Sequence, residues 1–354
     1  MNDRENLISL FRRKGYERVP VSFYLCPSLD AEYLKQTKAE MYYGDYFGFP
    51  WKDCPQLGLE HNPEQFLPWY KNTPLAEGTW IDYWGVAHEP GSKEAFHMTR
   101  MRHPLQGIDD LETIKSYPFP DHAKGKTSYQ KPAVDAIHAE GKAAAGGMEC
   151  TLWETAWYLR SMEDLMVDMM SDDPIAEFIL DKVTEQSCIR AEAFARAGVD
   201  MIMTGDDIGT QKTAMMSLEL YRKWIKPRFK KIIDAARAIK PDILIHYHSC
   251  GYATPFIEDL IEAGVDILNP LQSESMDVFE ILKEYGDRLS FTGAVGTQTV
   301  MPFGTPDEVK QTVYKILDAA GEKGGILPMP THILEPEVPW ENIIAYVEAC
   351  KSYK

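Results

Sequence analysis

The sequence predicts an α/β protein, a (β/α)8 TIM barrel that forms a single domain over residues 1–354. From about Asp135 onward, short apolar runs alternate with long amphipathic stretches, the pattern of repeated strand–helix units around a parallel sheet. Polar residues follow one run after another, as expected if all strand ends surround one barrel mouth. No G-x-G-x-x-G motif opens a helix after a strand, which disfavours an open dinucleotide-binding sheet.

The apolar runs are the expected strands. They lie at 19–24 (VPVSFY), 143–148, 200–205, 243–250, 266–270, 290–295 and 325–330. A closed barrel of this type has eight strands. We therefore expect one further strand, of irregular form, within Met41–Leu59.

The amphipathic stretches are the expected helices. They lie at 173–197, 217–239, 253–263, 275–285, 305–320 and 340–351. Ser217 and Thr305 precede two of them and can cap the first turn with a hydroxyl group. The charged residues 1–18 predict an N-terminal helix, and the runs within 79–104 predict a β-hairpin inserted around a Pro-Gly-Ser turn at 90–92.

The charge balance and the cysteines restrict the class of protein. With 54 acidic and 37 basic residues, the formal net charge is −17, which disfavours binding to nucleic acid or to an anionic membrane surface. The six cysteines form no C-x-x-C pair, as expected for reduced thiols. No apolar run approaches the ~18 residues of a membrane span. We expect a cytoplasmic protein and consider a homodimer as its assembly.

The run ILIHYHSCG at 243–251 places two strong zinc ligands, His248 and Cys250, at a strand end. Side chains two residues apart in a strand point to the same face, ~7 Å apart, so an imidazole and a thiolate can meet at one ion. The alternative is a hydrogen-bonded core histidine beside a small buried cysteine.

Carboxylates follow two neighbouring strands. Asp206 and Asp207 come after the 200–205 run, and because successive residues point in opposite directions, we expect only one to face the mouth. That residue would manage a proton or anchor a metal-bound imidazole; the alternative is a helix cap and a solvent carboxylate. Glu149 and Glu154 could be a proton acceptor or a further metal ligand, although Glu154 could instead start a helix with Arg160.

Several motifs together resemble one family. They are WGV at 84–86, TLWETAWYLRSMEDLMVDM at 151–169, GDDIGTQ at 205–211, HSCG at 248–251, PTH at 330–332 and PWEN at 339–342. The chain resembles the uroporphyrinogen decarboxylase superfamily, and within it the branch of zinc-dependent, corrinoid-linked methyltransferases. The resemblance implies a (β/α)8 barrel. Decarboxylases of the superfamily carry an arginine-rich motif after the first strand, whereas LCPSLDAEYL at 25–34 contains no arginine.

The resemblance also implies a zinc site. In the methyltransferase branch, the H-x-C pair is completed by a cysteine after a late strand, a position that falls on His332 here. Histidine is a competent zinc ligand, so the implied ligands are His248, Cys250 and His332, with an open fourth position. With one thiolate, zinc would keep a charge of +1 and polarise a methyl donor more strongly. Alternatively, His332 is a hydrogen-bonding residue in a metal-free site.

The function implied is transfer of a methyl group between a small methylated compound, such as a methoxy-aromatic, and the cobalt of a separate corrinoid protein. Zinc would polarise the leaving group, and Asp206, Asp207 or Glu154 would handle the proton. The residues expected to hold the substrate are Tyr24, Trp84, Glu149, Gln211 and Asn269. Two alternatives remain: a metal-free, decarboxylase-like enzyme of the same superfamily, and a non-catalytic barrel that binds a corrinoid or small ligand.

Overall fold

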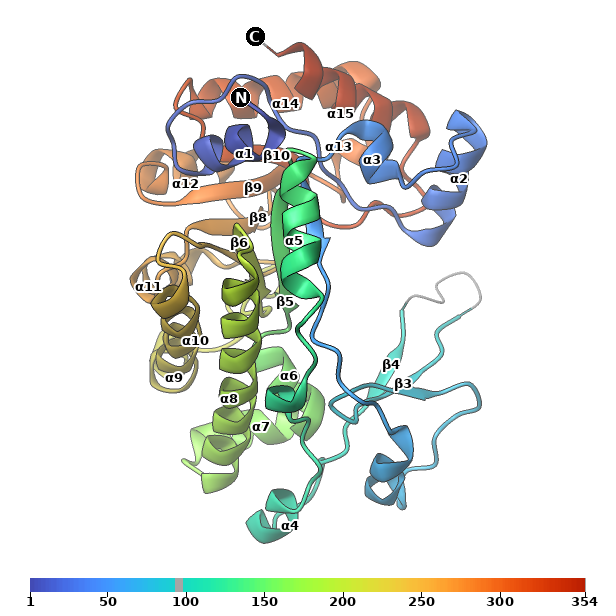
Figure 1. The fold of residues 1–354 in the computed structure, drawn as a ribbon, viewed down its shortest axis with the longest axis vertical. Helices are drawn as coiled ribbons and strands as arrows, with labels where there is room; N and C mark the ends of the chain where they lie inside the picture. The colour runs from blue at the N-terminus through green and yellow to red at the C-terminus, as the bar shows by residue number, and fades with distance from the viewer. Residues whose placement is uncertain (93–97, 354) are drawn as a thin grey trace.

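Seven parallel strands form one curled sheet, and helices cover its outer face (Figure 1). The computed structural model describes residues 1–92 and 98–353. In spatial order the strands are β1 (Trp51–Cys54), β5 (Ala143–Glu149), β6 (Met201–Gly205), β7 (Leu244–His248), β8 (Ile267–Leu271), β9 (Ser290–Val295) and β10 (Ile326–Pro330). The spatial order follows the chain order, as in a barrel. The predicted α/β barrel class is confirmed.

The helices occupy the connections between strands and the two ends of the chain. They are α1 (Asp3–Phe11), α2 (Pro27–Thr37), α3 (Tyr43–Phe47), α4 (Leu111–Lys115), α5 (Gln130–Ala139), α6 (Trp153–Arg160), α7 (Met162–Met170), α8 (Pro174–Ala197), α9 (Leu218–Leu220), α10 (Lys226–Ile239), α11 (Ile257–Ala263), α12 (Val278–Tyr285), α13 (Val300–Phe303), α14 (Pro306–Ala320) and α15 (Trp340–Ser352). Short 3-10 turns are η1 (Pro63–Tyr70), η2 (His122–Lys124) and η4 (Thr254–Phe256), and η3 (Tyr221–Ile225) is a π-helical segment.

The helix-start signals act as the sequence predicts. The Thr305 hydroxyl accepts from the Glu308 amide in a full capping box, and the Ser217 hydroxyl accepts from the Leu220 amide. The predicted helix at 217–239 is nevertheless interrupted by η3. Pro227, in the first turn of α10, has no amide hydrogen to donate to the preceding turn, and the chain widens into a π segment there.

The first strand prediction is wrong. Residues 19–24 form no strand, and the β-bridge next to this segment pairs Leu25 with Leu334. The Tyr346 hydroxyl, from α15, lies 2.9 Å from the carbonyl oxygens of both Ser22 and Pro328 and so replaces the ladder bonds to β10. The strand that we expected to be irregular, within Met41–Leu59, is the regular strand β1.

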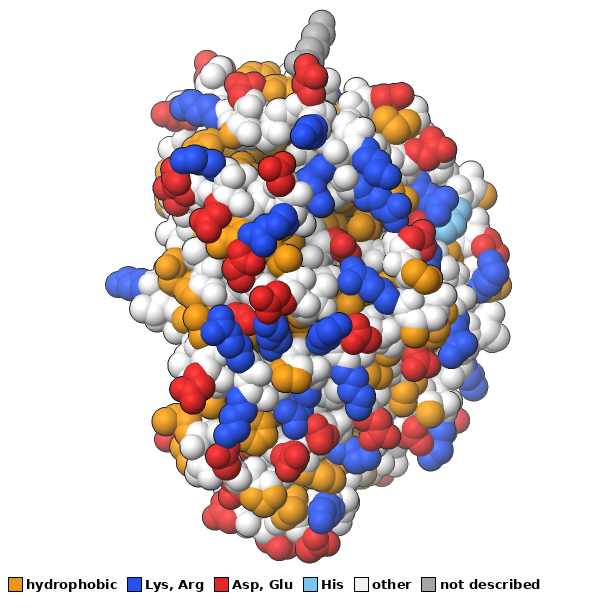
Figure 2. All heavy atoms as spheres, turned by 90° about the vertical axis from the view of Figure 1, so that its left-hand side faces the viewer, with side chains coloured by type: hydrophobic (Ala, Val, Ile, Leu, Met, Phe, Trp, Pro, Cys, Tyr) orange, Lys and Arg blue, Asp and Glu red, His pale blue; other side chains and the backbone are white. Residues whose placement is uncertain are grey.

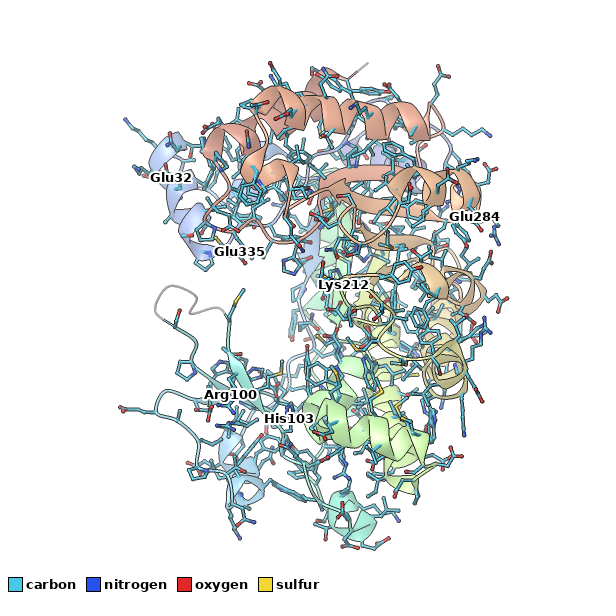
Figure 3. All side chains as sticks on the ribbon, turned by 180° about the vertical axis from the view of Figure 1, so that it is seen from behind. Glu32, Arg100, His103, Lys212, Glu284 and Glu335 are labelled. Carbon is cyan, nitrogen blue, oxygen red and sulfur yellow. The ribbon has the colours of Figure 1, made fainter. Side chains whose placement is uncertain are left out.

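A small antiparallel sheet lies beside the barrel. Its strands are β2 (Trp80–Ile81), β3 (Ala87–Glu89) and β4 (Arg100–Arg102), and β3 pairs with both others. Residues 93–97 of the predicted hairpin lie outside the described residues. The segment after β4 is tied to α6, because His103 Nδ1 lies 2.8 Å from the Tyr158 carbonyl oxygen. Figure 3 labels Arg100 and His103 in this part of the chain.

The outer surface carries both signs of charge despite the net charge of −17. Figure 2 shows acidic and basic side chains interspersed over one face of the molecule. No helix among the described residues combines the length and the apolar character needed to cross a membrane.

The Tyr346 contact can be tested by removing one oxygen atom. Tyr346→Phe leaves two buried carbonyl groups without this partner, so we expect the free energy of unfolding to fall by about 1–3 kcal/mol. Tyr353→Phe is the control, because its hydroxyl bonds Asp318 at the exposed surface, and it should change stability by less than ~0.5 kcal/mol. Urea unfolding measures both; equal effects would contradict the bridging role.

Candidate metal centre and active site

A cavity of about 400 Å³ opens at the carboxyl ends of the strands. Its lining residues come from five strand ends, from the first turn of α6 and from the segment at Tyr24: Tyr24, Glu149, Cys150, Glu154, Met203, Gly205, Asp207, His246, His248, Cys250, Asn269, Met329, Pro330, Thr331, His332 and Ile333. Concave sites at this face of a barrel are the usual place for ligands and catalytic groups.

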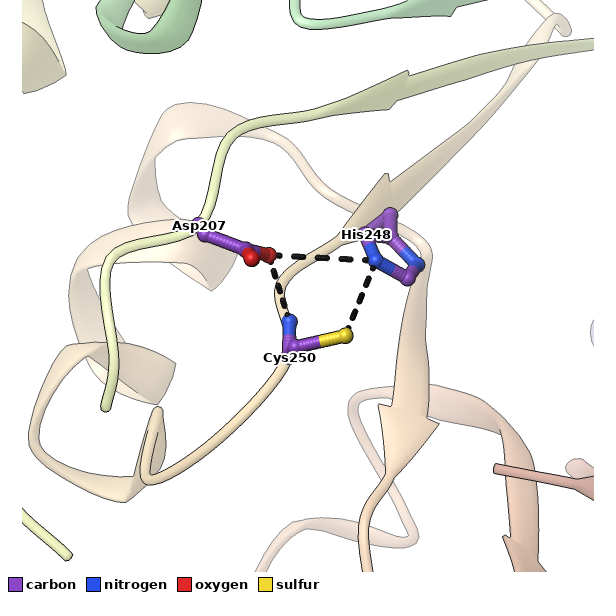
Figure 4. Close-up of side chains that lie close together, drawn as sticks. All are labelled: Asp207, His248 and Cys250. Atoms are coloured by element: carbon purple, nitrogen blue, oxygen red, sulfur yellow. Dashed lines mark hydrogen bonds and ion pairs between the residues drawn. The ribbon is translucent and has the colours of Figure 1, made fainter. Parts of the chain in front are cut away.

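Three potential metal ligands lie together in this cavity (Figure 4). His248 ends β7, and its Nε2 lies 3.3 Å from Cys250 Sγ. Asp207 Oδ1 accepts the Cys250 amide at 2.7 Å and lies 3.8 Å from His248 Nε2. Among the described residues, these three alone form a group of at least three ligand atoms that all lie within 4.8 Å of one another.

A hydrogen bond to Asn269 fixes the orientation of the His248 ring. Asn269 Nδ2 donates to Thr292 Oγ1 at 2.5 Å, which directs its oxygen toward His248 Nδ1, 2.6 Å away. His248 Nδ1 therefore carries the proton, and the lone pair of Nε2 points toward Cys250 and Asp207. Such a partner on the remote nitrogen is the usual support of a metal-bound histidine.

His332, the predicted third ligand, lines the same cavity but does not join the cluster. Burial lowers the pKa of His332, and the neighbouring His248 lowers it further, so the imidazole is neutral at neutral pH. The structure thus places Asp207, rather than His332, next to the H-x-C pair.

The two aspartates point in opposite directions, as alternation along an extended chain requires. The fully buried Asp206 carboxylate accepts from the Leu152 amide (3.0 Å) and the Glu154 amide (2.9 Å) at the start of α6. Burial raises the pKa of Asp206, and these backbone bonds oppose the rise. Asp207 lines the cavity. Of the two predicted catalytic aspartates, only Asp207 can meet a ligand there.

Two glutamates complete the polar wall. Glu154 accepts from the Tyr158 hydroxyl at 2.8 Å and from the Asp207 amide at 3.1 Å. Burial raises the pKa of Glu154, and the nearby Asp207 charge raises it further. Burial also raises the pKa of Glu149. Arg160 bonds Asp168 (2.9 Å) instead of Glu154, which leaves the Glu154 carboxylate to the cavity.

Comparison with known proteins identifies the family. The family described as Uroporphyrinogen decarboxylase (URO-D) matches residues 91–353. The chain belongs to the uroporphyrinogen decarboxylase family.

Relatives of this family member include two kinds of enzyme. A methylcobamide:CoM methyltransferase of Methanosarcina barkeri is 26% identical over 209 residues, which cover 59% of this chain and only 58% of that protein. A uroporphyrinogen decarboxylase of Pseudomonas fluorescens is 24% identical over 250 residues and 68% of each chain. A solved methyltransferase from Methanosarcina mazei has a TM-score of 0.69 at 20% identity over 99% of this chain and 98% of that one. At this identity the structural likeness establishes the fold.

Two residues predicted to bind substrate do not line the cavity of this family member. Trp84 lines a neighbouring cavity, which also includes Glu149. Gln211 Oε1 instead lies 3.0 Å from Gln272 Nε2 and 3.2 Å from Gln298 Nε2, and so ties loops together. Tyr24, Glu149 and Asn269 do line the cavity, although Asn269 also orients His248.

His246 is a cavity residue that the sequence analysis missed. It precedes His248 by two positions, so the H-x-H-x-C pattern places both rings on the same face of β7. The His246 side chain is 5% exposed, and its Nδ1 has no hydrogen-bond partner among the described residues. Burial lowers the pKa of His246 to about 3, so it is a neutral group available to a ligand at the cavity floor.

The different roles of the two aspartates can be tested by equivalent substitutions. Asp206→Asn replaces Oδ2, which lies 3.2 Å from the Leu152 amide, by an NH2 group, so that two buried donors would face each other, and we expect it to lower the free energy of unfolding by about 1–3 kcal/mol. Asp207→Asn keeps an oxygen that can accept the Cys250 amide and should cost less than ~1 kcal/mol. Parallel urea titrations compare them; equal losses would contradict the assignment.

Proposed function

We propose that this chain is a corrinoid-dependent methyltransferase that uses zinc. It would move a methyl group from a small methylated compound, such as a methoxy-aromatic, to the cobalt of a separate corrinoid protein. The observation that carries the proposal is the Asp207, His248 and Cys250 cluster, in which Asn269 directs the His248 lone pair toward the other two ligand atoms. The relatedness to methylcobamide:CoM methyltransferases supports it.

The donor set fits zinc. A histidine nitrogen, a cysteine sulfur and a carboxylate oxygen are all zinc ligands, and three protein ligands leave the open position of a catalytic site. His332, on the wall of the same cavity, is the fourth donor available. When bound, zinc supplies Lewis acidity to the group that carries the methyl.

The residues of the cavity wall would manage the rest of the reaction. The bond between methyl carbon and oxygen breaks, a carbon–cobalt bond forms, and the released oxygen takes a proton. Glu154 lies on the wall with Asp207 and is tied to Tyr158, so we assign to it the delivery of that proton. Asp206 supports this arrangement by fixing the start of α6, the helix that carries Glu154.

A metal-free decarboxylase is the second candidate, because uroporphyrinogen decarboxylases are also among the relatives. It would use the same carboxylates without zinc. The absence of arginine from residues 25–34 weakens it, since polycarboxylate substrates are gripped by arginine.

Zinc content separates the two candidates. We expect about one zinc per chain in protein purified without chelator, and a loss of at least ~10-fold in affinity in His248→Ala and Cys250→Ala, because each removes a ligand. Asp207→Ala should weaken zinc more than His332→Ala does. Elemental analysis and competition with a chelator measure this. Zinc-free protein after supplementation would contradict the zinc mechanism, and a larger effect of His332→Ala would restore His332 as the third ligand.

Methyl transfer is tested by the anaerobic loss of cob(I)alamin absorbance with a panel of methyl donors. The parent protein should convert cob(I)alamin to methylcobalamin, and Glu154→Gln should reduce turnover by about 10²-fold because it cannot deliver the proton. Its zinc content should stay unchanged, since Glu154 is not one of the three clustered ligands. An unaltered rate in Glu154→Gln would remove that role, and inactivity of the parent with every donor would count against the function.

A further inference from the structure

A second cavity, of about 340 Å³, adjoins the candidate active site. It lies between the barrel and the turn that joins β2 to β3. Its lining residues are Gln56, Leu57, Leu59, Asp82, Tyr83, Trp84, His122, Glu149, Cys150, Thr155, Tyr158 and Arg190. Glu149 and Cys150 line both cavities, so a ligand in one reaches the boundary of the other.

Arg190, on α8, is a cation of this wall whose hydrogen-bond partners are neutral oxygens. Its Nη2 lies 3.2 Å from the Gly147 carbonyl oxygen and 3.5 Å from Gln56 Oε1. Within the described chain, no residue accepts a hydrogen bond from its Nε or Nη1, and no carboxylate lies within the 4.0 Å of an ion pair. Burial lowers the pKa of Arg190, and the nearby Glu149 opposes that shift. An anionic ligand would supply hydrogen-bond acceptors and further charge compensation to this buried cation.

Arg190 is the only lysine or arginine among the lining residues that the structure describes, so it is the side chain of this wall that attracts an anion. Burial, together with the Arg190 charge, lowers the pKa of His122 to about 4, so His122 is neutral. The Asp82 carboxylate is already occupied, because it accepts from the Trp84 and Val86 amides (both 2.9 Å) and lies 3.1 Å from His88 Nε2.

The rings of Trp84 and Tyr158 form another part of the wall, and hydrogen bonds fix the turn that carries Trp84. The Asp82 bonds close the turn that carries Trp84, and the Tyr117 hydroxyl donates to the Trp84 carbonyl at 2.5 Å. Gly85 has a φ of +85°, and a Cβ there would meet the Phe66 ring at 2.4 Å, so the turn needs glycine. Trp84 and Tyr158 are thus held in place as flat surfaces for a ring.

We propose that the cavity of Arg190, Trp84 and Tyr158 binds the carboxylate and ring of a methoxybenzoate, whose methoxy group crosses the Glu149 and Cys150 boundary toward the Asp207, His248 and Cys250 cluster. Arginine pairs with carboxylates through hydrogen bonds from adjacent guanidinium nitrogens. The free Nη1 can donate one of these bonds, and Nη2 can donate the other in place of its 3.5 Å contact with Gln56 Oε1. The inference rests on the proposed function and narrows its methyl donor to an aryl methyl ether with a carboxylate on the ring.

The test compares an anionic ligand with its neutral counterpart. Isothermal titration calorimetry of the parent protein should show that 3-methoxybenzoate binds at least ~10-fold more tightly than 3-methoxybenzamide. Arg190→Gln should weaken binding of the acid by ~10–100-fold and leave binding of the amide nearly unchanged. Arg190→Lys should keep part of the preference, and it remains informative if Arg190→Gln does not fold. The matched control is Arg196→Gln, on the same helix, where Arg196 pairs with Glu192 at 3.3 Å.

The inference is overturned if neither ligand binds the parent, if both bind equally, or if Arg190→Gln weakens the two ligands to the same extent. Its failure is distinguishable from failure of the proposed function. Arg190-dependent binding without methyl transfer to cob(I)alamin would support the subsite and reject the activity. Methyl transfer from neutral ethers, without preference for the acid, would support the activity and reject the subsite.

Discussion

Close backbone packing between the ends of β6 and β7 is the constraint on which the candidate metal centre depends. Gly205 pairs in register with His248, and a Cβ at Gly205 would lie 2.6 Å from the His248 Cβ and 2.7 Å from its carbonyl oxygen. Any larger residue would separate the strands. This approach brings Asp207 and Cys250, each two residues further along, within one 2.7 Å hydrogen bond. In the next pair, His248 stands opposite Asn269, which orients its ring.

The presence of Asp207 in the cluster changes the net charge that the sequence predicts for a zinc ion at this site. With Cys250 as the only anionic ligand, a divalent ion would keep a charge of +1, and that charge favoured activation of a methyl donor. As a ligand, the Asp207 carboxylate would supply the second negative charge that a cysteine at position 332 would give. In the proposed site, the charge at the metal would therefore favour neither direction of methyl transfer. In the proposed reaction, the choice of substrate would then depend on the cavity walls, where Trp84 and Tyr158 offer flat surfaces for an aromatic ring.

Sequence reasoning was reliable where local pattern determines structure and failed where distant contacts do. The six later strands and the caps at Ser217 and Thr305 follow from apolar runs and hydroxyl positions, and the same-face meeting of His248 and Cys250 follows from strand alternation. Residues 19–24 have a strand-like composition, but the Tyr346 hydroxyl, more than 300 residues away, takes the ladder position. Similarly, nothing local indicates that Gln211 bonds Gln272 and Gln298, or that Asp207 joins the H-x-C pair in one cluster of ligand atoms.

The cavity concentrates buried acidic groups, and its described lining residues include no lysine or arginine. Burial raises the pKa of both Glu149 and Glu154, the Asp207 charge adds to the effect on Glu154, and the neighbouring His246 and His332 have lowered pKa values and are neutral. In a structural core such a group of carboxyls would only destabilise the fold. A divalent cation bound to the folded state alone would reverse this cost, since its binding free energy adds to stability. Buried carboxyl groups with raised pKa values beside the Asp207, His248 and Cys250 cluster are therefore more typical of a functional site than of a structural core.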